Sequence, residues 1–111
     1  MKKLFLTDTY GGYHRSIPDN DLRLTAVEKG SPMGEVLRQV WQPVAMSSEV
    51  DEVPKAIRMF GEDLVVFRTT KGEIGILDRH CSHRGTSLEY GIPSDDGIIC
   101  CYHGWHFAVN G

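Results

Sequence analysis

The feature that most constrains this chain is a pair of short segments that each combine a cysteine with a histidine. The first segment supplies Cys81 and His83, and the second supplies Cys100 and His103. Two thiolates and two imidazoles serve two kinds of metal site in proteins: a tetrahedral zinc site, and a 2Fe-2S cluster in which the cysteines hold one iron and the histidines hold the other. Because each segment delivers one ligand of each type, the spacing favours the cluster, with zinc as the alternative.

A coincidence of unrelated cysteines and histidines is the simplest competing interpretation. A buried free cysteine is often only a small apolar residue, and a single histidine is usually a surface or core residue. However, all three cysteines and three of the five histidines of the chain lie within residues 80–103. This clustering favours two metal-binding loops over chance.

Length and charge narrow the class of protein. With 111 residues and a formal net charge of -3, the chain suits one small domain and has no basic stripe that would favour a nucleic-acid partner. Three cysteines that all lie near the metal-binding segments make no disulfide framework, so we expect a cytoplasmic protein. The apolar run at residues 4–6 ends at Thr7, so we expect neither a signal peptide nor a membrane anchor from it.

The N-terminal part of the chain differs in pattern from the rest. We expect residues 1–42 to form an irregular arm followed by one short helix at about residues 32–40, because Ser31-Pro32 is a helix-start signal and apolar residues then recur at helical spacing. Trp41, at the end of this helix, is expected to anchor the core. Residues 43–111 are expected to form the metal-binding domain.

Residues 43–111 carry short runs that are typical of antiparallel strands. The expected strands cover about residues 56–60, 63–70, 74–77, 97–100 and 105–109, with a turn at Lys71-Gly72. The third and fourth strands lead into the two metal-binding segments, so a mainly β fold, a small antiparallel sandwich, would present both at one end. Asn110-Gly111 is a strong turn signal with no return strand after it, so we expect the domain to be truncated at its C-terminus.

At this point the chain resembles a known family. The motifs C-S-H-R-G-T-S-L-E-Y-G at residues 81–91 and C-C-Y-H-G-W at residues 100–105 resemble those of the oxygenase subunits of Rieske non-haem iron oxygenases, most closely the phthalate-dioxygenase-like branch. The likeness extends more weakly over residues 33–111. It implies a Rieske 2Fe-2S cluster whose inner iron is bound by Cys81 and Cys100 and whose outer iron is bound by His83 and His103. Ser82 stands where this family usually has proline, which removes no ligand.

The resemblance also implies roles for the neighbours of the four ligands. Trp105 and Arg84 are expected beside the cluster, and no residue of this chain is expected to be catalytic. Cys101 is expected to be a packing residue, because the family's ligand stands two residues before the tyrosine of the Tyr-His-Gly-Trp motif. His106 is expected outside the site, because alternation along a strand turns it away from Trp105. Trp105 stands where cytochrome-type Rieske proteins have a serine that hydrogen-bonds to the cluster, which implies a potential in the lower part of the Rieske range.

The function implied by the resemblance is a relay of single electrons. They would pass from a reductase or ferredoxin to a mononuclear non-haem Fe(II) in a catalytic domain that these 111 residues do not contain. The whole protein would be a dioxygenase or monooxygenase that hydroxylates or O-demethylates an aromatic compound, as a trimer or hexamer. A free-standing Rieske ferredoxin is an alternative, disfavoured by the long segment before the first strand, and a structural Cys2His2 zinc module is a second.

Overall fold

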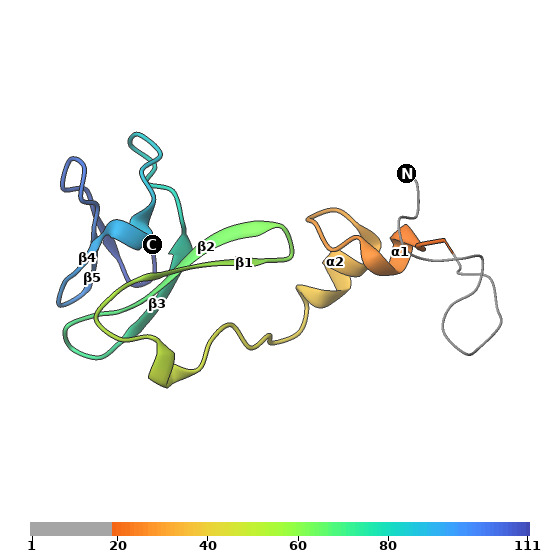
Figure 1. Ribbon diagram of the computed structural model, residues 1–111, viewed down its shortest axis with the longest axis horizontal. Coiled ribbons are helices and arrows are strands. Elements are labelled where there is room, and N and C mark those ends of the chain that lie inside the picture. The colour runs from red at the N-terminus through yellow and green to blue at the C-terminus, as the bar shows by residue number, and fades with distance from the viewer. Residues whose placement is uncertain (1–18) are drawn as a thin grey trace, which may run out of the picture.

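The computed structural model describes residues 19–111, so the apolar run at residues 4–6 lies outside the described residues. Two short helices come first, and the strands and both cysteine–histidine segments follow (Figure 1). The helices lie at one end of the described chain and the strands at the other, connected by an extended segment. The predicted helical N-terminal segment and mainly β remainder are therefore confirmed.

Helix α2 (Pro32–Leu37) begins where the sequence predicts it. The Ser31 side chain accepts a hydrogen bond from the backbone N–H of Gly34 at 3.2 Å, and Pro32 occupies the first turn, where no N–H partner is needed. The helix ends at Leu37, earlier than the predicted residue 40. Within the expected irregular arm, α1 (Leu22–Thr25) is a single helical turn capped by the Asp21 carboxylate.

The prediction that Trp41 anchors the core is wrong. Trp41 is fully exposed, and Val36 and Val40 are more than half exposed. The reason is that α2 is held by its other side: the Arg38 guanidinium donates hydrogen bonds to the carbonyl oxygens of Val27 and Gly34, and to that of Phe60 in the β1–β2 turn. Periodicity identified a helix but not which of its faces is covered.

The first sheet contains the three predicted strands that precede the first cysteine. They are β1 (Lys55–Met59), β2 (Glu62–Arg68) and β3 (Ile74–Asp78), paired antiparallel in that order. The turn from β2 to β3 contains Gly72 at φ +92°, a conformation that favours glycine. Phe67 lies opposite Gly75, where a Cβ atom would collide with the Phe67 ring, so glycine at this position lets the ring fill the core.

The second sheet is smaller. It contains β4 (Ile92–Pro93), β5 (Gly97–Ile99) and β6 (His106–Ala108), again antiparallel in that order, with a 3-10 turn, η3 (Leu88–Tyr90), before it. β5 begins at the predicted residue and ends one residue earlier, and β6 is one residue shorter at each end, so that Cys100 and Trp105 belong to the loop between them. β4 was not predicted, since a two-residue strand that ends in proline has no periodicity.

The core lies between the two sheets and reaches the base of both cysteine–histidine segments. Apolar side chains from β2, η3 and β5 form one cluster with two of the cysteines: Val65, Phe67, Leu88, Ile98, Cys81 and Cys100. All six side chains are at most 3% exposed. The predicted small antiparallel fold with two loops at one end is confirmed, and the two cysteines are part of its core.

Candidate metal centre

The first metal-binding loop, residues 81–86, is a tight six-residue turn. The Cys81 N–H donates to the Thr86 carbonyl at 2.9 Å, and the Gly85 N–H donates back to the Cys81 carbonyl at 2.7 Å. Gly85 has φ +77°, where an L-residue with a side chain would be strained. These bonds turn the chain sharply and leave His83 at the outer end of the loop.

The second metal-binding loop, residues 100–105, repeats this backbone arrangement. The Cys100 N–H donates to the Trp105 carbonyl at 2.8 Å, and the Gly104 N–H donates to the Cys100 carbonyl at 3.0 Å, with Gly104 at φ +75°. Cys100 therefore occupies the position that Cys81 has in the first loop, whereas Cys101 corresponds to the second residue of that loop. Both loops project from the same end of the β region (Figure 1).

The thiols of the two equivalent cysteines lie together in the core. Cys81 and Cys100 are each 3% exposed, whereas Cys101 is exposed, and all three are free of disulfide bonds. The pKa of the Cys100 thiol is lowered, first because the backbone N–H of Tyr102 donates to it. Hydrogen bonds from Cys81, the His103 N–H and the Thr86 side chain act in the same direction, and burial opposes them. The site thus favours a thiolate at Cys100.

The imidazoles of the two loops form a separate, exposed pair. The ring centroids of His83 and His103 are 4.7 Å apart, with the rings at 76° to each other. Trp105 stacks on His83 at 4.6 Å and 10°, and Tyr102 lies 3.8 Å from His103 at 52°. Two aromatic rings of the second loop therefore pack against the imidazoles, which lie side by side at the surface.

These four donors fit a mixed-ligand 2Fe-2S cluster. Two buried thiols and two exposed imidazoles provide one pair of sulfur ligands on the inside and one pair of nitrogen ligands on the outside, which is the division of ligands in a Rieske centre. Within residues 19–111, no three His, Cys, Asp or Glu side chains surround a single metal position. By type and by depth the four donors form two pairs, as such a cluster requires.

The other residues singled out from the sequence take different places. Arg84 is exposed in the first loop, next to His83. The His106 Nε2 atom lies 2.9 Å from the Ser94 hydroxyl oxygen and 3.1 Å from an Asp96 carboxylate oxygen, so its partners belong to neither metal-binding loop. The ion pair between Arg79 and Glu89, which are ten residues apart in the chain, was not predicted from the sequence.

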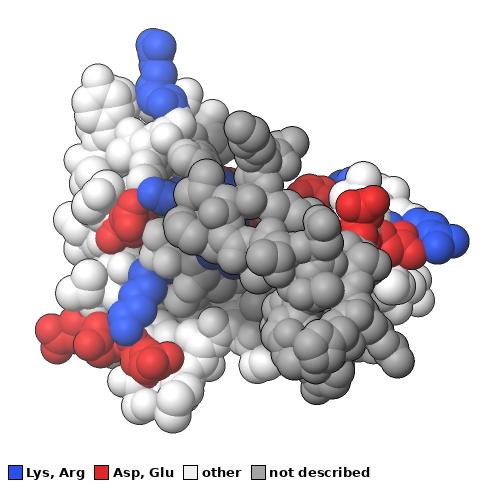
Figure 2. Space-filling model, turned by 45° about the vertical axis from the view of Figure 1, so that its right-hand side comes forward, with Lys and Arg blue, Asp and Glu red and all other residues white. Residues whose placement is uncertain are grey.

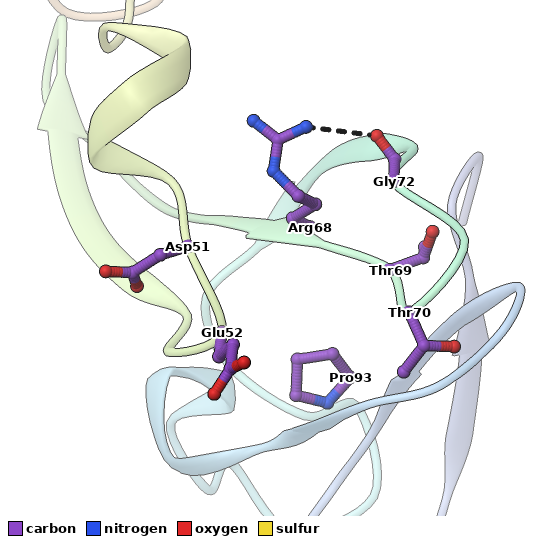
Figure 3. Close-up of a pocket in the computed structure, with 7 residues that line it drawn as sticks. All are labelled: Asp51, Glu52, Arg68, Thr69, Thr70, Gly72 and Pro93. Carbon is purple, nitrogen blue, oxygen red and sulfur yellow. Dashed lines mark hydrogen bonds between the residues drawn. The ribbon is translucent and has the colours of Figure 1, made fainter.

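A cavity of about 510 Å³ lies apart from both metal-binding loops (Figure 3). Its walls come from the segment between the 3-10 turn η2 (Ser47–Glu49) and β1, from the end of β2 and the β2–β3 turn, and from β4, and none of its lining residues belongs to either loop. Arg68 lines it, but the Arg68 guanidinium already donates to the carbonyl oxygens of Ser47, Val50 and Gly72. Arg68 therefore holds the segment before β1 against the β2–β3 hairpin, and its hydrogen-bonding groups serve the fold and not a ligand in the cavity. The metal centre is the stronger candidate site for this reason.

The surface charge is mixed. Figure 2 shows both acidic and basic side chains among the described residues of the face that it presents. None of the helices in residues 19–111 is long and apolar enough to cross a bilayer.

The sequence matches known proteins over most of its length. The model of the family "Rieske [2Fe-2S] domain" matches residues 40–111. Tert-butanol monooxygenase / tert-amyl alcohol desaturase oxygenase subunit of Aquincola tertiaricarbonis is 50% identical over 92% of this chain and 23% of its own length. Phenoxybenzoate dioxygenase subunit alpha of Ectopseudomonas oleovorans is 52% identical over 91% of this chain and 25% of its own length. Phthalate 4,5-dioxygenase oxygenase subunit of Pseudomonas putida is 46% identical over 85% of this chain and 22% of its own length. The chain spans about a quarter of the length of these relatives.

Solved structures agree with the sequence comparison. Dicamba monooxygenase bound to dicamba superposes with a TM-score of 0.62 at 29% identity, over 68% of this chain and 24% of that one. The oxygenase of carbazole 1,9a-dioxygenase, in complex with its ferredoxin, gives a TM-score of 0.51 at 35% identity. The match covers 62% of this chain and 18% of that one. Each likeness covers about two thirds of this chain.

The fold and the paired donors define an iron–sulfur domain with mixed cysteine and histidine ligands. The chain belongs to the Rieske [2Fe-2S] domain family, in the form found in phthalate-dioxygenase-like ring-hydroxylating oxygenase subunits. The cofactor of this family, and so of this domain, is a Rieske 2Fe-2S cluster.

Proposed function

We propose that this chain is the electron-relay part of an oxygenase subunit, with residues 43–111 as the Rieske domain. Cys81 and Cys100 bind the inner iron, and His83 and His103 bind the outer iron. The observation that carries the proposal is the separation of ligands by depth: both thiols lie in the core and both imidazoles at the surface. When bound, the cluster supplies one-electron redox chemistry at a potential above that of all-cysteine ferredoxins.

The residues of this chain do three things for that relay. The buried cysteines and Leu88 keep water from the sulfur side of the site. The exposed imidazoles of His83 and His103 give an electron a short path to and from a docked partner. Trp105, stacked on His83, fixes the ring orientation across the two loops. The chain thus holds the cluster near the surface without exposing its sulfur ligands.

We propose that the electron donor is a ferredoxin or reductase and that the acceptor is a mononuclear iron in a catalytic domain outside these 111 residues. The carbazole 1,9a-dioxygenase oxygenase in complex with its ferredoxin supports a protein donor. The names of the relatives include aromatic acids and an aliphatic alcohol. Hydroxylation or O-demethylation of an aromatic compound is the activity we propose for the whole protein.

We further propose that the assembled protein is a homo-oligomer in which the exposed face of α2 contacts a second copy of the subunit. This face consists of Val36 in α2 and of Val40 and Trp41, which follow the end of the helix, and a groove of about 340 Å³ lies beside it. The family model begins only at residue 40, whereas relatives that are whole oxygenase subunits match over 92% of the chain. The α2 segment is therefore shared with oxygenase subunits beyond their Rieske module, which suits a role in assembly.

The relay is tested by redox titration of the purified, cluster-loaded chain. A plant-type ferredoxin at about -400 mV should reduce it, and each cluster should accept a single electron within the Rieske range of about -150 to +300 mV, in the lower part of that range. Uptake of two electrons, or no reduction by the ferredoxin, would contradict the proposal.

A further inference from the structure

Arg79 lies two residues before Cys81 and ties together the two ends of the first metal-binding loop. Its Nε atom donates to the Ser87 hydroxyl at 3.0 Å, and its Nη2 atom donates to the Glu89 carboxylate at 2.8 Å. The Ser87 hydroxyl also donates to that carboxylate, at 2.9 Å. The three side chains therefore form a closed ring of hydrogen bonds at the base of the loop.

The two metal-binding loops differ in what closes their bases. The second loop sits on the regular ladder of β5 and β6, in which Ile99 and His106 are paired. The first loop is flanked only by an isolated bridge between His80 and Ser87. The side-chain ring around Arg79 stands where the second loop has a continuous strand pair, so it supplies the restraint that the backbone lacks.

The backbone of Arg79 extends this restraint to the sulfur side of the site. Its carbonyl accepts from the Leu88 N–H at 2.7 Å, and its N–H donates to the Asp63 carbonyl in β2 at 3.1 Å. Leu88 lies between the two residues that the guanidinium binds, is 2% exposed, and belongs to the core cluster with Cys81 and Cys100. Arg79 thus connects β2, the first loop and the residue that packs with both thiols.

The Arg79–Glu89 pair is the only arginine–carboxylate ion pair within the described residues in which neither side chain is more than 32% exposed. The two side chains are 32% and 23% exposed, compared with 70% and 34% for Arg58 and Asp63. Charge-assisted hydrogen bonds gain strength when they are partly removed from water, whereas exposed pairs contribute little. Removing either partner therefore leaves a partly desolvated charge near the metal centre.

We propose that Arg79 is a positioning residue for the cluster: through Ser87 and Glu89 it fixes the first loop and Leu88, and its charge balances that of Glu89. The inference rests on the proposed electron-relay function. Reduction of the cluster adds one negative charge, so its potential responds to unbalanced charge nearby. Arg79→Gln leaves the Glu89 carboxylate unpaired and lowers the potential, whereas Glu89→Gln leaves the guanidinium unpaired and raises it.

The test is to measure the midpoint potential and the electron paramagnetic resonance spectrum of the reduced cluster in the loaded chain. We expect shifts of opposite sign for Arg79→Gln and Glu89→Gln, and a return toward the wild-type potential in the double variant. Arg79→Lys keeps the charge but not the two-armed hydrogen bonding, so its potential should stay close to wild type while its spectrum broadens. Arg58→Gln, at an exposed pair in β1, is the matched control and should change neither.

The outcomes separate this inference from the function it rests on. Shifts of the same sign in the two single variants, or shifts no larger than that of Arg58→Gln, would overturn the positioning role. If Arg79→Gln does not retain a cluster, the midpoint potential of Glu89→Gln still tests the positioning role. A potential above that of wild type supports the role, and a potential at or below it overturns the role. A wild-type chain that binds no 2Fe-2S cluster would instead overturn the proposed function.

Discussion

Trp105 of the second metal-binding loop stacks on His83 of the first, with ring centroids 4.6 Å apart and ring planes 10° apart. The indole is 46% exposed, so it covers the imidazole from the outside and is not itself a core residue. This contact connects the two loops at their outer ends, whereas the cysteines connect them at their base. The sequence placed Trp105 beside the expected cluster, and the structure adds that Trp105 contacts His83, one of the proposed ligands.

Replacing Trp105 by leucine should loosen the first loop without removing a ligand. Aromatic stacking contributes about 0.5–1.5 kcal/mol beyond area burial, so we expect the cluster-free Trp105→Leu chain to lose about 1 kcal/mol of unfolding free energy. The loaded variant should release iron to a chelator faster than wild type. Trp105→Phe keeps a ring and should recover much of both effects. Equal iron release from all three proteins would show that the stacking is incidental.

Cys100, not Cys101, should be required for the cluster. The backbone hydrogen bonds of the second loop place Cys100 where the first loop has Cys81, and only Cys100 is buried with it. Cys100→Ser should therefore abolish the normal cluster spectrum, while Cys101→Ser should leave iron content and spectrum unchanged. The reverse result, with a cluster in Cys100→Ser and none in Cys101→Ser, would reverse the assignment.

Trp41→Ser should weaken self-association of the chain, because it removes the most exposed aromatic side chain from the proposed subunit contact. Sedimentation velocity over a range of protein concentrations measures the effect. Val53→Ser is the control, since Val53 is also exposed, at 64%, but lies just before β1 and not between Val36 and Trp41. Identical sedimentation of Trp41→Ser and wild type would count against a second copy on this face.

Asp95 should make the fold sensitive to acid. The Thr70 hydroxyl donates to the Asp95 carboxylate and Lys71 lies 3.7 Å from it, which lowers the pKa of this carboxyl in the folded state. A lowered folded-state pKa stabilises the fold above the unfolded value of about 3.9 and ceases to do so as the pH falls through the folded-state pKa. Urea unfolding at a series of pH values should show this loss in wild type and a flatter profile in Asp95→Ala. Parallel profiles would exclude the contribution.

The proposed ligands and the strands next to them were predictable from the sequence because their signals are local. Two short motifs name the four donors, and β1, β2 and β3 follow from alternation and a glycine turn. The exposure of Trp41 was not predictable in this way, since helical spacing defines a stripe but not what covers it. The Arg79–Glu89 pair depends on the path of the first loop between them, which no spacing rule supplies.

The account depends most on the identity of the metal centre, and the iron and acid-labile sulfide content of the purified chain tests it most directly. A Rieske cluster requires two irons and two sulfides per chain and makes the protein red-brown. We predict this result for the wild-type chain. A colourless protein that holds one zinc ion per chain, with no sulfide, would contradict it.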